Sequence, residues 1–184
     1  MTTGEALAAP QAERAGLVRR LAALVYESSL LGALAILLGF VLLPLVGPPG
    51  SPAPGDRLPL LTHAARAASF TCLFALCAGY CVWLWSGGRR TLPMKTWRLA
   101  LRAADGAAPS VARAALRYLA WWIGPACAMA AYVALRHGGN DRWALALLAM
   151  NYAWALVDPD RQFLHDRIAG TRIVRSDSYG RGAS

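Results

Sequence analysis

The chain has 184 residues, the length of one domain, and 57% of them are hydrophobic, above the roughly 45–50% apolar usage of soluble domains. These residues gather in long runs and only 16% of the chain is charged, which indicates an integral membrane protein and excludes an ordinary soluble one. The formal net charge of +9 is also typical of nucleic-acid-binding proteins, but here the basic residues flank apolar runs, so no nucleic-acid partner is expected.

The N-terminal part predicts a polar leader and then a first membrane helix. Residues 1–18 contain no apolar core with a cleavage site, so we expect a flexible cytoplasmic leader instead of a signal peptide. Residues 21–45 are almost entirely apolar and exceed the roughly 20 residues that a membrane helix needs. Glu27 follows Arg20 by about two helical turns, so both project from nearly the same face. A carboxylate at that depth needs a partner or water.

The middle of the chain predicts a second helix and then a strongly basic segment. A loop rich in proline and glycine over residues 47–55 precedes the second helix, which ends near Trp85. Residues 89–117 are the most basic part, and we expect them to lie on the cytoplasmic membrane surface against lipid headgroups. A short pair of strands over residues 92–104 is the alternative. The candidate lipid contacts are Arg89, Arg90, Lys95, Arg98 and Arg102.

The last two apolar runs predict a third helix and a short fourth one. Residues 118–135 form the third, and Gly124-Pro125 is expected to kink it. Residues 143–157 cover only about 22 Å as an α-helix, against a bilayer core of roughly 30 Å. This run crosses with local thinning, borrows flanking residues or is re-entrant, and the sequence leaves all three open. Asn151 within it is expected to hydrogen-bond across helices.

The distribution of basic residues predicts the topology. Four crossings place fifteen of the nineteen Lys and Arg residues on one side, so both termini are expected to be cytoplasmic. The predicted fold is an all-α integral membrane protein, a four-helix transmembrane bundle with three full spans and a short fourth. Residues 19–174 form this membrane domain, and residues 175–184 are expected to be a flexible cytoplasmic tail.

A charged motif follows the last apolar run. Residues 164–171 read LHDRIAGT, and residues 91–95 in the middle of the chain read TLPMK. Together with Arg20 and Glu27, these segments resemble the RDD family of small bacterial membrane proteins over about residues 19–174. That family is named for an arginine and two aspartates, which match Arg20, Glu27 and Asp166. The chain differs in having Glu for the first Asp and Pro93 where the family commonly has Gly.

The resemblance implies a multi-pass protein of the bacterial inner membrane whose family has no settled biochemical activity. With both ends cytoplasmic, we expect Arg20, Glu27, Asp166 and Arg167 to form a charge network with a structural or accessory role. The alternative is an oligomeric transporter or a cation or proton exchanger that uses Glu27 and Asp166. Membrane lipids, a second copy of the chain or another membrane protein are the expected partners.

Enzymatic function is not expected. The sequence shows no Ser-His-Asp, thiol-His or HExxH arrangement and no phosphate loop of Walker spacing. The four cysteines fall inside apolar stretches, where they are expected to be small buried hydrophobic residues. His165 beside Asp166 suggests a metal or a proton relay, but a hydrogen-bonded neighbour is the simpler interpretation. No metal and no cofactor are therefore expected.

Overall fold

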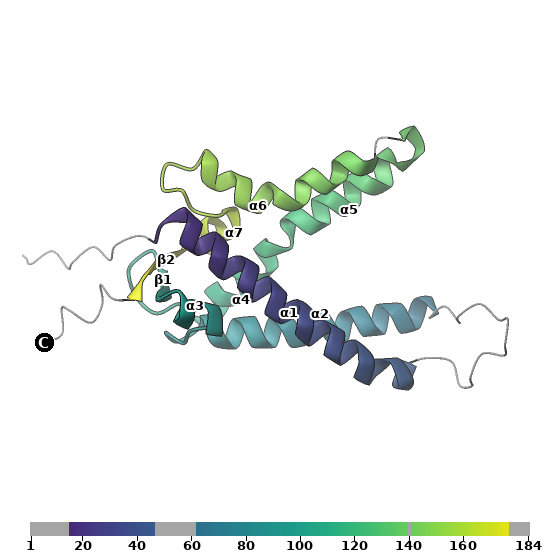
Figure 1. Ribbon diagram of the computed structural model, residues 1–184, viewed down its shortest axis with the longest axis horizontal. Helices are drawn as coiled ribbons and strands as arrows, with labels where there is room; N and C mark the ends of the chain where they lie inside the picture. The colour runs from purple at the N-terminus through teal and green to yellow at the C-terminus, as the bar shows by residue number, and fades with distance from the viewer. Residues whose placement is uncertain (1–14, 47–61, 140, 177–184) are drawn as a thin grey trace, which may run out of the picture.

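The computed structural model describes residues 15–46, 62–139 and 141–176 (Figure 1). The predicted leader up to residue 14, the loop at residues 47–61 and the end of the tail lie outside the described residues. In chain order, the elements are α1 (Leu17–Val46), α2 (His63–Trp85), α3 (Leu92–Thr96), β1 (Leu99–Ala103), α4 (Val111–Trp121), α5 (Ile123–Leu135), η1 (Arg136–Gly138), η2 (Asp141–Ala149), α6 (Met150–Ala153), η3 (Trp154–Leu156), α7 (Leu164–Ile168) and β2 (Thr171–Arg175).

Three helices of the described chain are long and apolar enough to cross a membrane, by length and composition. They are Leu17–Leu42, His63–Trp85 and the combined α4 and α5 helix, Val111–Leu135. Large apolar side chains project outward along the first two, with Phe40 73% exposed and Phe70 58% exposed. Such exposure in water is costly, whereas lipid chains solvate it. The predicted first, second and third membrane helices are therefore present.

The third span is interrupted where the sequence predicted a kink. Helix α4 ends at Trp121 and α5 begins at Ile123. Pro125 has no backbone N–H, so the carbonyl of Trp121, four residues earlier, loses its helical donor. The side chain of Asn151 replaces that donor, since its Nδ2 donates to the Trp121 carbonyl at 2.8 Å and to the Ala120 carbonyl at 3.4 Å. The predicted hydrogen bond of Asn151 across helices is confirmed.

The predicted short fourth helix is mostly a 3-10 helix that packs along α5. It consists of η2, α6 and η3, over Asp141–Leu156 (Figure 1). A 3-10 helix rises about 2.0 Å per residue against 1.5 Å for an α-helix, so this run extends about 30 Å. The backbones approach closely at Gly124, where a Cβ would lie 3.2 Å from the carbonyl oxygens of Leu147 and Leu148.

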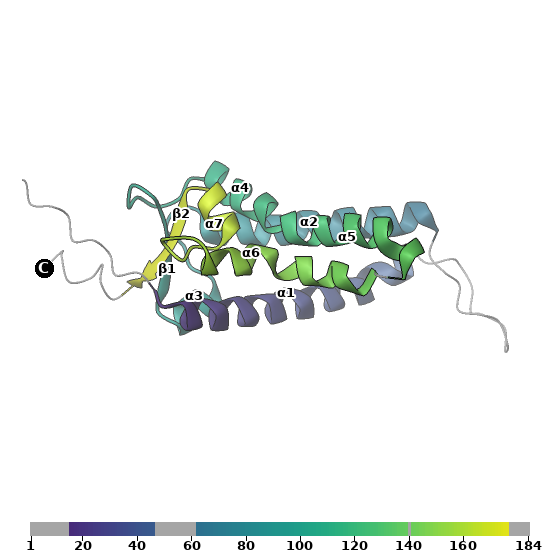
Figure 2. The ribbon, with the colours of Figure 1, turned by 90° about the horizontal axis from the view of Figure 1, so that it is seen from above.

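Four short elements, α3, β1, α7 and β2, form a cap at one end of the bundle (Figure 1). Figures 1 and 2 show α3, α7 and the two strands together at the end where α1 begins and α2 ends, while the α1–α2 and α5–η2 arms diverge from it. Strand β1 pairs with β2 antiparallel, with Leu101 opposite Ile173. The Ala15 amide donates to the Ile173 carbonyl at 3.5 Å, which attaches the start of α1 to the cap.

The sequence predicted an all-α fold, and this prediction is wrong in one respect, because the described chain also contains the two-stranded sheet of β1 and β2. The predicted alternative of a short pair of strands over residues 92–104 is wrong, because Leu92–Thr96 form helix α3 and the single strand β1 pairs with β2 in the tail. The tail strand has the sequence TRIVR, with three β-branched residues that favour a strand. The core of the described chain also centres here, on Cys81, Trp85 and Tyr118 beside the cap residues Met94, Leu99 and Leu101.

Candidate functional site

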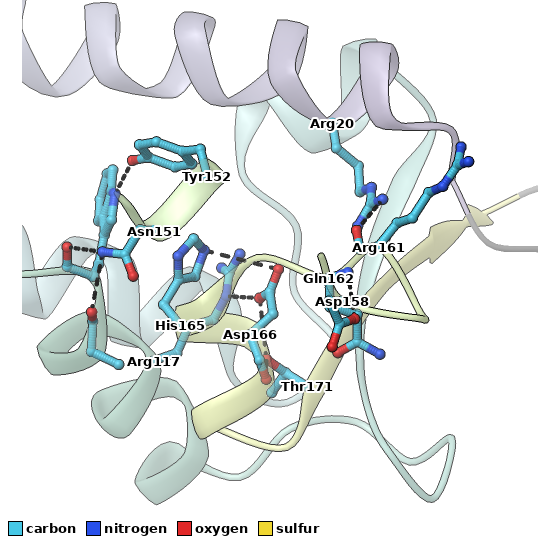
Figure 3. Close-up of polar contacts among 12 residues, drawn as sticks. Arg20, Arg117, Asn151, Tyr152, Asp158, Arg161, Gln162, His165, Asp166 and Thr171 are labelled. Atoms are coloured by element: carbon cyan, nitrogen blue, oxygen red, sulfur yellow. Dashed lines mark hydrogen bonds and ion pairs between the residues drawn. The ribbon is translucent and has the colours of Figure 1, made fainter. Parts of the chain in front are cut away.

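A buried ion pair joins the tail motif to the third span. Asp166 Oδ1 accepts a hydrogen bond from Arg117 Nε at 2.6 Å (Figure 3). Arg117 is 4% exposed and Asp166 1% exposed. The Thr171 hydroxyl donates to the same carboxylate oxygen at 3.3 Å. Two residues 49 positions apart in the sequence are thus held together by one charge-assisted hydrogen bond.

The surroundings keep Asp166 ionised. Burial alone raises the pKa of its carboxyl group, because water no longer solvates the charge. The attraction of Arg117, assisted by its hydrogen bond and by the nearby His165 and Arg20, outweighs burial and brings the pKa below the ordinary value of 3.8. Asp166 is therefore a carboxylate throughout the physiological pH range.

Arg117 is the functional residue that sequence reasoning missed, because it was counted with the basic surface segment. Its guanidinium lies over the ring of Trp85, with 4.2 Å from Cζ to the ring centroid. It therefore belongs to the core and not to the surface. A usable signal was its position directly before Tyr118, where the third membrane helix was expected to enter the bilayer, because an arginine at that depth needs a partner.

Glu27 approaches the same arginine from α1. Its side chain is buried, with 7% exposure. The indole of Trp85 at the end of α2 and the hydroxyl of Thr91 at the start of α3 face its carboxyl group, and Arg117 is the opposite charge that acts on it most strongly. Thr91 also accepts a hydrogen bond from the Met94 amide, which fixes its orientation as the N-cap of α3. Glu27 thus lies where α1 meets the end of α2, the start of α3 and the middle of α4.

Arg20 holds the loop that precedes α7. Its Nη2 donates to the Arg161 carbonyl at 2.6 Å, and its Cζ lies 5.3 Å from the ring centroid of Phe163 (Figure 3). The loop is shaped by Asp158, whose Oδ2 accepts from the Gln162 amide at 2.9 Å. Arg161 has φ +50°, a left-handed conformation that costs energy in a non-glycine residue.

Arg167 is the one predicted network residue that points away from the others. Its side chain is 54% exposed, and it pairs with Asp160 at 3.2 Å and with Asp158 at 3.9 Å. Its neighbour Asp166 faces inward because successive residues of a helix project about 100° apart. The structure therefore brings Glu27 and Asp166 to Arg117, places Arg20 where its charge acts on Asp166, and leaves Arg167 on the surface.

His165 lies between this charge cluster and a group of aromatic rings. It stacks on Phe163 at 5.6 Å between ring centroids and also contacts Tyr152 and Trp121. Its Nε2 is 3.9 Å from Asp166 Oδ2. Burial lowers the pKa of the imidazole to about 4, despite the attraction of Asp166 for the charged form. His165 is therefore a neutral ring at pH 7.

The predicted lipid contacts fall in several environments. Arg89 and Lys95 are exposed near the end of α2 and in α3, and Arg90 is partly buried between them. Arg98 is exposed with φ +52°, directly before β1. Arg102 lies in β1 and is partly buried, opposite Arg172 of β2. Arg89, Arg90 and Lys95 thus lie in one short stretch, whereas Arg102 belongs to the sheet.

Comparison with known proteins identifies the family. The model of the RDD family matches residues 14–170. The chain belongs to the RDD family. Neither the search of the curated proteins nor that of the solved structures gave a match. Membership of RDD together with three long apolar helices makes this a membrane protein.

Arg20 and Glu27 of α1 and Asp166 of α7 are the residues that the sequence led us to expect at the positions for which RDD is named. Arg117 of α4 is the main opposite charge that acts on both acids, and Arg20 also acts on Asp166. Glutamate in place of the first aspartate extends the carboxyl group by one methylene toward Trp85 and Thr91. Within the described residues, no group of three or more His, Cys, Asp or Glu side chains could hold a metal ion. The RDD site is therefore a cluster of two arginines and two acids.

Proposed function

We propose that this RDD protein is a multi-pass protein of the bacterial inner membrane with a structural or accessory role and no enzymatic activity. Its buried charge cluster acts as a clamp that fixes the tail against the membrane helices. The observation that carries this proposal is the Arg117–Asp166 pair, which is almost fully buried and joins α4 to α7 at 2.6 Å.

The energetics of a buried pair support a clamp. Removing one partner leaves the other charge buried and uncompensated, which costs about 3–5 kcal/mol. A well-packed apolar pair of similar volume is often as stable as the ion pair or more so. The main effect of the charges is therefore to specify how the tail docks. A buried Asp166 carboxylate is stable only beside Arg117, and an apolar side chain in place of Arg117 would leave it uncompensated.

Four crossings with both termini cytoplasmic are the proposed topology. Supporting it, the described cap elements α3, β1, α7 and β2 gather at one end of the bundle (Figure 2). The most basic stretch of the sequence, residues 89–117, includes two of these elements. The length of the 3-10 run, about 30 Å, matches the bilayer core better than an α-helix of the same residues. Labelling of single introduced cysteines from either side of the membrane tests this topology.

The clamp is tested by comparing single and double replacements of the ion pair. Asp166→Leu and Arg117→Met should each lower the thermal stability of the protein in detergent, whereas the double variant with both replacements should recover most of the loss. Asp105→Asn, which breaks the exposed Arg113–Asp105 pair, is the matched control and should change little. Additive losses in the double variant would contradict the clamp.

The transport alternative is separated by a flux measurement. The parent, Glu27→Gln and Asp166→Asn are reconstituted in liposomes, and pH-driven cation flux is followed with a trapped dye. The clamp predicts no flux in the parent and a loss of stability in both variants. Flux in the parent that both folded variants lose would instead assign the carboxylates to a transport path. Such a path would require a homo-oligomer, because one copy offers few helices to line it.

A further inference from the structure

The side chain of Arg89 is held in one orientation just beyond the end of the second span. Its Nε donates to the Trp83 carbonyl at 2.6 Å, and its Nη2 donates to the Ser86 hydroxyl at 2.9 Å. Its Cζ lies 4.0 Å from the centroid of the Trp83 ring. Gly87, with φ +62°, turns the chain here, and a Cβ at that position would lie 3.5 Å from Arg89 Nη1.

The positive charge of this arginine is not neutralised by the part of the chain that the structure describes. Among the described residues, no ion pair joins Arg89 to a carboxylate, and the ion pairs found there involve Arg113, Arg117 and Arg167. The two hydrogen bonds of Arg89 use the N–H of Nε and one N–H of Nη2, so the N–H groups of Nη1 and the second N–H of Nη2 are left for a ligand. A planar guanidinium fixed in this way is suited to an oxygen anion, because two parallel N–H groups match two oxygens of a phosphate.

The position of the side chain favours a lipid as the source of that phosphate. Trp83 belongs to the last turn of a membrane helix and is 64% exposed, and tryptophan at such an end lies at the level of the headgroups. Arg89 follows that end by four residues, and the exposed Lys95 belongs to the same short stretch. Several basic residues at headgroup depth attract anionic lipids.

We propose that Arg89, stacked on Trp83, binds the phosphate of an anionic phospholipid. This proposal deepens the expected contact between the basic segment and the membrane and rests on that contact. Trp83 supplies the apolar side of the site, where the glycerol and upper acyl chain lie, and Arg89 supplies the charge. Arg89 is thus distinguished from other arginines of the cap, such as Arg113, whose charge Asp105 already neutralises.

The test uses the full chain purified in a neutral detergent. Thermal stability is titrated with dioctanoyl phosphatidylglycerol, dioctanoyl phosphatidylcholine and inorganic phosphate, for the parent, Arg89→Gln and the control Arg113→Gln. The phosphatidylglycerol concentration for half of the full shift should rise about fivefold in Arg89→Gln and stay unchanged in Arg113→Gln. Arg89→Lys, which keeps the charge, should also weaken binding, because lysine cannot stack on Trp83 and bond the phosphate with a fork.

Several results would overturn the site. One is an equal response of the parent to both lipids, and another is the same loss in Arg113→Gln as in Arg89→Gln, which would mean that only total surface charge matters. A response to inorganic phosphate as strong as that to the lipid would indicate a free anion instead. Full binding by both Arg89 variants would remove the residue from the site. None of these results affects the clamp, because the clamp is measured by the stability of Asp166→Leu.

Discussion

Asn151 donates from its side-chain Nδ2 to the carbonyl of Trp121 at 2.8 Å, and Pro125 is the reason that this carbonyl is available. Replacing Asn151 with leucine leaves a buried carbonyl without a donor. We expect Asn151→Leu to lower the free energy of unfolding by about 1–3 kcal/mol, measured by denaturation in detergent.

The role of Pro125 can be tested separately. Pro125→Ala restores a backbone N–H that can bond the Trp121 carbonyl, so in this background Asn151→Leu should cost less than it does alone. A double-mutant cycle of thermal stabilities measures the difference. Equal costs of Asn151→Leu in the two backgrounds would show that Asn151 stabilises the fold by a route other than the interrupted helix.

Gly124 permits the close approach of α5 and η2. A Cβ there would lie 3.2 Å from two backbone carbonyl oxygens, which cannot move as a flexible side chain can. Gly124→Ala is therefore expected to separate the two helices and cost about 1–3 kcal/mol. Gly79→Ala is the control, because nothing described lies within 4 Å of a Cβ at Gly79, and alanine favours a helix. Unchanged stability in Gly124→Ala would contradict the close approach.

Stability should fall as the pH is lowered from about 6.5 to about 4, because of His165. The pKa of this imidazole is about 4 in the folded protein and near 6.5 when unfolded, so in this window the unfolded chain binds a proton that the folded chain does not. The loss approaches about 1.4 kcal/mol per pH unit. Asp166 adds to the loss only at the lower end of this window, because the pKa of its carboxyl group is about 3.8 in the unfolded chain and lower in the folded protein. The slope should be smaller in His165→Gln, measured by denaturation across this range.

Arg161 adopts a left-handed conformation so that its carbonyl can accept from Arg20. Its side chain is exposed, so glycine should relieve the strain without loss of packing. Because glycine also adds entropy to the unfolded chain, we expect Arg161→Gly to change stability by less than about 1 kcal/mol. Arg161→Val should be clearly destabilising, as measured by thermal denaturation. Equal stabilities of the two variants would contradict a strained backbone.

The sequence predicted those features that depend on local composition. The three long helices follow from uninterrupted apolar runs, and the interruption of the third follows from Pro125, because neither depends on distant contacts. A meeting of Arg20, Glu27, Asp166 and Arg167 was predicted from membrane depth and from a topology with both termini on one side, and Arg167 lies on the surface instead. Asn151 was expected to hydrogen-bond because a polar amide within a membrane helix needs a partner.

The features that the sequence did not predict depend on contacts between distant segments. The pairing of β1 with the tail joins residues about seventy positions apart, and no local periodicity reports such a partner. Arg117 and Arg113 have the same charge and lie one helical turn apart, yet one is buried and the other exposed. Only the positions of Trp85 and Asp166 decide which of them enters the core.

The order of these segments along the chain has a consequence for biogenesis. Glu27 and Arg117 are synthesised before Asp166, so the first three helices enter the membrane while the arginine has no anion in the tail to pair with. The strand that closes the cap is translated later still. Assembly of the bundle can therefore be completed only when the ribosome has passed residue 175. In a chain cut short before Asp166, Arg117 lacks the carboxylate that forms its hydrogen-bonded ion pair, and the unfinished cap should make the chain a substrate for quality-control proteases.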